Sequence, residues 1–161
     1  MNSLTIPQLY GWLEEVKDPE IPVLSLVDLG VVTAMRIDGQ NVHIEMTPTF
    51  VGCPALDIMK QEIVGVLQKY GVRQVFISVS FKDPWTSDKI SEKGKQALKD
   101  FGLAPPPSGK IFTDLELLDH AQCPRCNKTN TEIKNVFGPT LCRSIHYCFD
   151  CKEAFEQFKP I

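Results

Sequence analysis

Two pairs of cysteines near the C-terminal end have the residue types and the spacing of a metal site. They are Cys123 and Cys126 in one pair and Cys148 and Cys151 in the other, each with two intervening residues. This spacing lets both thiolates of a pair turn toward one ion, and two pairs complete a tetrahedral set of four sulfurs. Such a closed set leaves no position for a substrate. The pattern therefore predicts one structural Zn²⁺ per chain, although iron also accepts four thiolates.

Three further residues near these pairs carry ligand atoms. Cys142 precedes Cys148 by six positions. We expect it to pack in a small core, because a free cysteine behaves as a small hydrophobe; the alternative is a substitute ligand. His120 and His146 are expected to be bystanders, since four cysteines already complete the site.

Cys53 is the single cysteine of the front two-thirds of the chain, within Thr47–Pro54. It falls near the predicted start of a helix, with Pro54 at the first helical position. Helix N-terminal amides stabilise a thiolate, so this position predicts a thiol pKa below about 8.5. Thr47 and Thr49 point to the same side of an extended chain, which predicts that both hydroxyls line one pocket with Cys53.

A carboxylate, Asp28, interrupts the apolar stretch 24–30. It either caps a local turn or faces a pocket with Cys53, because a carboxylate in apolar surroundings needs a partner. The competing interpretation of Cys53 is ordinary packing. A Cys/His hydrolase is poorly supported, since no histidine is placed to act as the base. His43 lies in a predicted strand, and we expect it at the surface or at a sheet edge.

The elements that position these residues predict an α+β fold with a small layered front unit. The periodicity predicts a first helix that begins at Pro7 and ends before Asp18-Pro19, followed by strands over 31–37 and 42–46 with a turn at Asp38-Gly39 between them. It then predicts a helix over 56–70, a strand over 74–81 and a helix over 91–101.

The tail is predicted to form short strands over 131–137, 143–147 and 154–158. It has too few residues for an apolar core of its own, so it needs a metal or disulfides to fold. We therefore predict a first domain over 1–103, a Pro-rich linker over 104–112 and a metal-binding ribbon over 113–161.

Charge and hydropathy exclude several classes of partner. The 161 residues carry 17 basic and 20 acidic side chains, a net charge of -3, without the basic stripe that nucleic-acid binding requires. The most apolar run, 21–35, is too short to span a membrane and contains Asp28. The N-terminus shows no signal peptide, so we expect a cytoplasmic protein whose cysteines are thiols or metal ligands.

Several motifs together resemble a known family. Asp18–Val23, Asp28–Val32, Thr47–Thr49 and Gly52–Pro54 are similar to the MIP18 (DUF59) family, which is tied to iron–sulfur cluster assembly. Its characteristic aspartate, threonine and cysteine correspond to Asp28, Thr47 and Cys53. The further motifs 83–86, 137–142 and 155–159 extend the resemblance over nearly the whole chain to the PaaD/PaaJ family of the ring-1,2-phenylacetyl-CoA epoxidase system. One departure is Pro139, where a small residue is expected in the hairpin turn.

The resemblance implies an accessory, non-catalytic subunit in aerobic phenylacetate breakdown, with the oxygenase and reductase subunits as partners. It implies help in maturing an iron or iron–sulfur centre, through transient contact with Cys53 in a pocket shaped by Asp28, Thr47 and Thr49. A general iron–sulfur assembly factor, a cysteine-nucleophile enzyme and a purely structural adaptor remain alternatives. The oligomeric state stays open, a homodimer included.

Overall fold

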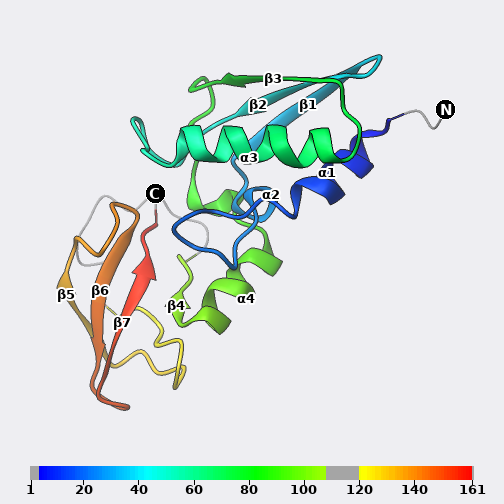
Figure 1. Cartoon of the computed structure of the whole chain (residues 1–161). Helices are drawn as coiled ribbons and strands as arrows, with labels where there is room; N and C mark the ends of the chain where they lie inside the picture. The colour runs from blue at the N-terminus through cyan, green and yellow to red at the C-terminus, as the bar shows by residue number, and fades with distance from the viewer. Residues whose placement is uncertain (1–3, 108–119, 161) are drawn as a thin grey trace. The chain divides into compact units, whose positions relative to one another are not determined.

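The computed structural model describes residues 4–107 and 120–160. Their contacts divide between Trp85 and Thr86 into an N-terminal unit and a C-terminal unit, each described here by itself (Figure 1). This division lies earlier than the expected domain end at residue 103. Residues 108–112 of the expected linker and 113–119 of the expected ribbon lie outside the described residues.

The N-terminal unit is a three-stranded sheet with helices packed against it. β1 (Val32–Asp38) and β2 (Asn41–Met46) form an antiparallel hairpin, and α3 (Leu56–Lys69) crosses over to β3 (Gln74–Val79), which runs parallel to β2. The strand order is β1-β2-β3, and α3 lies across the sheet (Figure 1). α1 (Ile6–Leu13) contacts α3. The predicted α+β class is confirmed.

The core of this unit follows from strand and helix periodicity. Alternate β2 side chains turn inward, while α1 and α3 contribute residues at helical spacing. The fully buried members include Val42, Ile44, Met46, Ile63, Leu67, Leu9 and Leu13. β2 is the central strand, so the sheet-edge alternative for His43 is wrong. His43 is half-buried and stacks on Phe76, with ring centroids 4.8 Å apart.

A four-residue helix, α2 (Leu26–Leu29), was not predicted, because one turn is too short to show helical periodicity. Ser25 caps it by accepting a hydrogen bond from the Asp28 amide, and Gly30 ends it at φ 74°. The indole of Trp85 is buried and donates to the Leu29 carbonyl at 2.8 Å. This bond fixes the segment after β3 against α2.

The C-terminal unit begins with η1 (Ser87–Lys89) and α4 (Glu92–Phe101). Ser91 caps α4 by accepting from the Gly94 amide, and Gly102 ends it at φ 89°. Next, β4 (Leu103–Ala104) pairs with β7 (Glu153–Phe158) in a sheet of order β4-β7-β6-β5, with β5 at Thr131–Asn135 and β6 at Arg143–Cys148. The pairing of β4 with β7 joins α4, which directly precedes β4, to this unit. Ala104, which was expected in the linker, lies in a small buried cluster of the same unit.

None of the helices within residues 4–107 and 120–160 is long and apolar enough to cross a membrane.

We expect Gly65→Ala to stabilise the N-terminal unit by about 0.5–1 kcal/mol, because glycine loses more backbone entropy than alanine in a helix. Gly65 is exposed in α3, and an added Cβ would meet nothing within 4 Å. Gly71→Ala is the matched control: its φ of +89° predicts a loss of about 1–2 kcal/mol. Both tryptophans, Trp12 and Trp85, belong to this unit, so denaturation followed by their fluorescence reports on it. A stabilising Gly71→Ala would contradict the argument.

Candidate metal centre and motif-lined thiol

The four paired cysteines come together at one end of the C-terminal sheet. Their sulfurs all lie within 4.8 Å of one another. Cys123 and Cys151 are 3.7 Å apart at Sγ, and Cys126 and Cys148 are 3.5 Å apart. Four sulfurs at about 2.3 Å from a central Zn²⁺ have tetrahedral edges of about 3.8 Å. The donor set therefore fits a Zn²⁺ ion, and the separations are far beyond the disulfide bond length of about 2.05 Å.

The two cysteine pairs form turns of the same kind. In the first, the Asn127 amide donates to the Cys123 carbonyl, and the Cys123 amide donates to the Lys128 carbonyl, both at 2.9 Å. The residue after each pair has left-handed backbone, with φ 60° at Asn127 and 59° at Lys152. After this reversal the Lys128 amide donates to the Cys126 sulfur and the Glu153 amide to the Cys151 sulfur, and such bonds favour the thiolate form.

The two thiols of the second pair, Cys148 and Cys151, differ widely in pKa. The Cys151 amide, together with the Asp150 amide and the Cys126 thiol, donates to Cys148 and lowers the pKa of its thiol to about 7. Burial, followed by the neighbouring thiols, raises the pKa of Cys151 to about 12. Because Zn²⁺ binds thiolates, its binding must release protons here.

The neighbouring candidate ligands stay outside the four-sulfur cluster. Cys142 is buried, as expected, and its Sγ lies 3.1 Å from Thr140 Oγ1. Six residues of extended β6 place it about 20 Å from Cys148. His146 is buried beside Ser144, with Nε2 2.8 Å from the hydroxyl, and stacks on Phe155. His120 is exposed.

Cys53 lies before α3 rather than at its cap. The helix begins at Leu56 with Ala55 as N-cap, three positions after the thiol. The expected amides are nevertheless present, since Ala55 and Leu56 both donate to the sulfur. Burial is the larger effect and raises the pKa of the Cys53 thiol, and the Glu20 and Asp18 carboxylates raise it further. The predicted depression of this pKa is therefore wrong.

One family-like motif, Asp18–Val23, contributes charged side chains near this thiol from an earlier part of the chain. Asp18 and Glu20 act on Cys53 through their charge. Asp18 Oδ1 also accepts from the Glu20 and Ile21 amides, each at 2.8 Å, and so shapes the 18–24 loop. Sequence reasoning did not assign Asp18 and Glu20 to the site. The sequence did contain a signal for these two residues, because both lie in the family-like motif Asp18–Val23.

The other predicted site residues have defined local roles. Asp28 Oδ2 accepts from the Ser25 hydroxyl at 2.8 Å, so Asp28 holds the side chain of Ser25, which caps α2. Thr47 is buried, and its amide donates to the Val31 carbonyl at 2.8 Å, which ties the 47–53 segment to the 28–32 segment. Thr49 is half-buried in the bend that follows. A common pocket of these three residues with Cys53 remains a prediction.

We expect the alkylation rate of Cys53 to keep rising above pH 8.5, the approximate pKa of an unperturbed cysteine. Only the thiolate reacts, and burial with two nearby carboxylates disfavours it. Glu20→Gln should move the midpoint to lower pH, because it removes one of these charges. The measurement is iodoacetamide modification followed by mass spectrometry, with Glu62→Gln on the exposed face of α3 as control. A midpoint well below pH 8.5 in the unmodified chain would contradict this assignment.

Two family models match the chain in succession. Residues 7–75 match an iron–sulfur cluster assembly protein model, and residues 108–159 match the PaaD zinc beta ribbon domain. Among solved structures, a DUF59 domain from Bacillus anthracis is 33% identical with a TM-score of 0.54, covering 57% of this chain and 89% of that one. A conserved hypothetical protein from Thermotoga maritima is 30% identical with a TM-score of 0.52, covering 64% of this chain and 100% of that one.

Similarity to curated proteins extends beyond the first unit. A putative component of the 1,2-phenylacetyl-CoA epoxidase of Escherichia coli K12, its D-subunit, is 31% identical over 97% of this chain and 93% of its own length. The Fe-S protein maturation auxiliary factor YitW of Bacillus subtilis is 37% identical over 61% of this chain and 97% of its own. The chain therefore belongs to the MIP18 (DUF59) family of iron–sulfur cluster assembly proteins, in the PaaD-like form that carries a C-terminal zinc ribbon.

Proposed function

We propose that this chain is a non-catalytic accessory subunit of a phenylacetyl-CoA 1,2-epoxidase system in aerobic phenylacetate breakdown. It assists maturation of an iron or iron–sulfur centre in the oxygenase or reductase subunit, in the cytoplasm. The Escherichia coli relative named as an epoxidase component, similar over almost the full length of both chains, supports the choice of system. The match of residues 7–75 to the assembly model supports the maturation role.

The observation that carries the proposal is the environment of Cys53. Its sulfur is half-buried, receives two backbone amides and lies in the field of two carboxylates, Asp18 and Glu20. A raised pKa keeps the thiol protonated at neutral pH, so the resting side chain is a poor ligand. Incoming iron competes with that proton, and the carboxylates favour the approach of a cation. Weak, proton-coupled binding suits a residue that must also release the metal.

In this proposal the remaining predicted residues shape the surroundings of Cys53. Asp28, fixed by Ser25, holds α2, and the Thr47 amide holds the chain that leads to the thiol. Along the sequence, the proposed iron-contacting domain lies within residues 1–103, the linker is 104–112 and the ribbon is 113–161, while contacts group α4 and β4 with the ribbon. Cys123, Cys126, Cys148 and Cys151 hold the Zn²⁺, which supplies folding stability to the ribbon.

Two alternatives make different use of the same residues. A general iron–sulfur assembly factor is favoured by the maturation factor of Bacillus subtilis, which matches 61% of this chain. A cysteine-nucleophile enzyme is disfavoured, because the pKa of Cys53 is raised and not lowered. The one histidine of the N-terminal unit, His43, is occupied in a stack with Phe76.

The proposal predicts that Fe²⁺ protects Cys53 from alkylation under anaerobic conditions. Glu20→Gln should reduce this protection more than Glu62→Gln does, because the Glu20 carboxylate contributes negative charge at the thiol. The protein should be zinc-loaded beforehand, so that the four-cysteine site takes no iron. Modification is followed by mass spectrometry of the peptide containing Cys53. Equal alkylation of Cys53 with and without Fe²⁺ would mean that the thiol does not contact the metal.

A further inference from the structure

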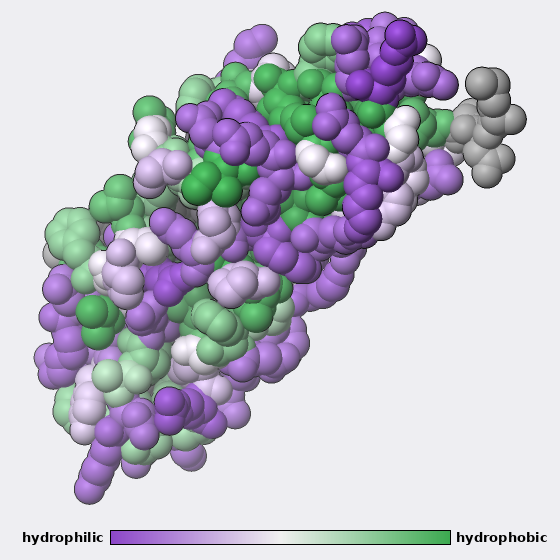
Figure 2. Space-filling model, in the orientation of Figure 1, coloured by the Kyte–Doolittle hydropathy of each residue, from purple (hydrophilic) through white to green (hydrophobic). Residues whose placement is uncertain are grey.

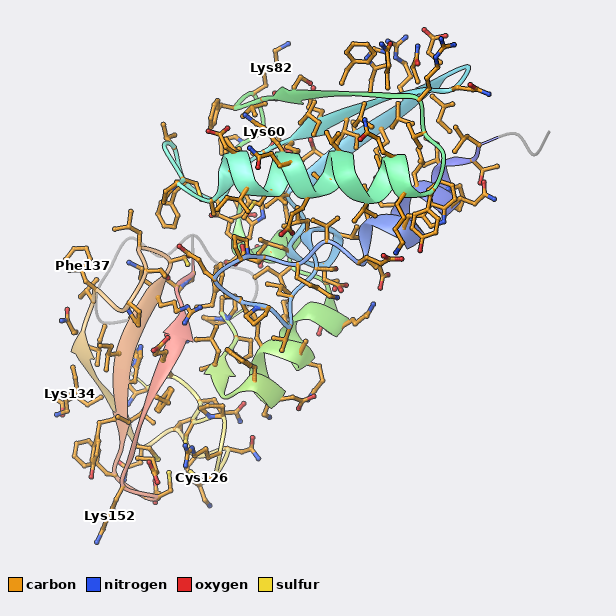
Figure 3. All side chains as sticks on the ribbon, in the orientation of Figure 1. Lys60, Lys82, Cys126, Lys134, Phe137 and Lys152 are labelled. Atoms are coloured by element: carbon orange, nitrogen blue, oxygen red, sulfur yellow. The ribbon has the colours of Figure 1, made fainter. Side chains whose placement is uncertain are left out.

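The loop between β5 and β6 presents two large apolar side chains to solvent. Phe137 is 63% exposed and Leu141 62% exposed, and residues 136–142 include no charged side chain. Phe137 points outward at the end of the ribbon opposite Cys126 and Lys152 (Figure 3). In the space-filling view, hydrophobic residues reach the surface among hydrophilic ones (Figure 2). A rigid apolar pair of this kind is a candidate anchor for another protein.

The loop is held in one shape by its own hydrogen bonds. The Gly138 amide donates to the Arg143 carbonyl at 2.8 Å, and the Arg143 amide donates to the Thr140 carbonyl at 3.2 Å. The Phe137 amide donates to Asn135 Oδ1 at 2.9 Å. A Cβ on Gly138 would lie 3.0 Å from Arg143 Cβ, so the loop closes tightly on β6. Such preorganisation reduces the entropy lost on binding.

A half-buried cation accompanies the apolar pair. Lys159 Nζ lies 5.3 Å from the centroid of the Phe137 ring, and its backbone amide donates to the Cys142 carbonyl at 2.8 Å. Burial lowers the pKa of the Lys159 amine. Within residues 4–107 and 120–160, no carboxylate forms an ion pair with Lys159, whereas Lys134 pairs with Glu132 at 2.7 Å. A partner that brings a carboxylate would compensate the desolvated charge.

We propose that Phe137, Leu141 and Lys159 form a docking surface for a partner protein that offers an apolar pocket with a carboxylate at its rim. The identity of that partner as the oxygenase or the reductase rests on the function proposed above. Two anchors and one charge make a small interface, which favours a transient complex. A transient complex suits a subunit that serves its partner and then leaves.

A second copy of the chain is the less favourable occupant. In a two-fold dimer the same surface faces itself, so Lys159 of one copy would approach Lys159 of the other. The loop supplies no carboxylate to compensate them. Like charges at a desolvated interface oppose association.

The test is the affinity of the zinc-loaded chain for the purified oxygenase and for the purified reductase, by isothermal titration calorimetry. We expect one of them to bind, and Phe137→Ser combined with Leu141→Ser to weaken binding at least about tenfold. Phe81→Ser, which removes a similarly exposed ring (52%) from the N-terminal unit, is the matched control and should stay within about twofold. Zinc content and circular dichroism verify that each variant is folded.

The charge is tested separately. Lys159→Glu should weaken binding by at least about tenfold, and Lys82→Glu, an exposed charge reversal in the N-terminal unit, by less than about twofold. Undiminished binding by either docking variant, or no binding of the unmodified chain to either protein, would overturn the proposal. So would a dimer in sedimentation that these variants dissociate.

The docking surface and the maturation role can fail independently. Cys53→Ser should bind with unchanged affinity, because Cys53 is not part of the docking surface. Normal binding by the docking variants with failed maturation by Cys53→Ser would reject the docking surface alone. Lost binding by the docking variants with normal maturation by Cys53→Ser would reject the role of the thiol.

Discussion

Cys126→Ser is expected to abolish zinc binding and to unfold the C-terminal sheet while the N-terminal unit stays folded. One buried cluster of this sheet consists of Ala104, Ala121 and Phe155 packed with the metal-binding cysteines. A structural Zn²⁺ contributes about 10–16 kcal/mol of apparent binding free energy in small zinc domains, comparable with the whole stability of a domain, about 5–15 kcal/mol. Because β4 pairs with β7, the loss should extend to Leu103 and Ala104.

The measurement is zinc content by elemental analysis together with two-dimensional NMR of the labelled chain. Cys142→Ser is the control, since Cys142 lies at the opposite end of β6 from Cys148 and should leave zinc bound. Acid should release the metal, because protons compete with it for all four sulfurs. A folded metal-free ribbon would contradict the energetic argument. A visible iron–sulfur absorbance without zinc, in anaerobically purified protein, would contradict the metal assignment.

Cys53→Ser is expected to leave a folded, zinc-loaded protein that no longer supports growth on phenylacetate. Serine is close to cysteine in size, and its hydroxyl can accept the Ala55 and Leu56 amides that donate to the sulfur. It is a much poorer ligand for iron, since it lacks the soft thiolate. Metal delivery should therefore fail without loss of stability. The assay is complementation of a strain that lacks this chain.

Cys142→Ser is the matched control for this experiment, because it removes the other cysteine outside the four-sulfur cluster and should complement fully. The iron content of the oxygenase and reductase from each strain distinguishes failed delivery from low expression. Growth of the Cys53→Ser strain at the unmodified rate, with normal partner iron, would leave Cys53 as a packing residue and remove it from the mechanism.

The periodic parts of the fold could be predicted from the sequence. α3 carries its apolar residues at helical spacing and ends before Gly71, which has positive φ, and β2 alternates strictly. α2 and β4 could not be predicted, because elements of four and two residues show no period. β4 is defined only by its pairing with β7, about 50 residues further along the chain. That long-range contact joined α4 to the ribbon, which local composition could not indicate.

The candidate sites were predictable to different degrees. The four-cysteine cluster follows from spacing alone, because two short pairs on adjacent turns can meet at one ion. The environment of Cys53 does not, because its pKa reflects a competition between amides, burial and charge. Sequence showed the amides near a helix start but neither the burial nor Asp18 and Glu20, which lie more than thirty positions earlier and reach the thiol only through the fold.

If this chain matures a metal centre of its partners, as proposed, the metal content of those partners must depend on it and on Cys53. The oxygenase and reductase are produced with this chain, without it and with Cys53→Ser, and the iron and acid-labile sulfide of each purified partner are quantified. We expect one partner to carry full iron only with the unmodified chain, and the Cys53→Ser sample to match the sample without the chain. Equal iron and sulfide in both partners under all three conditions would contradict the account.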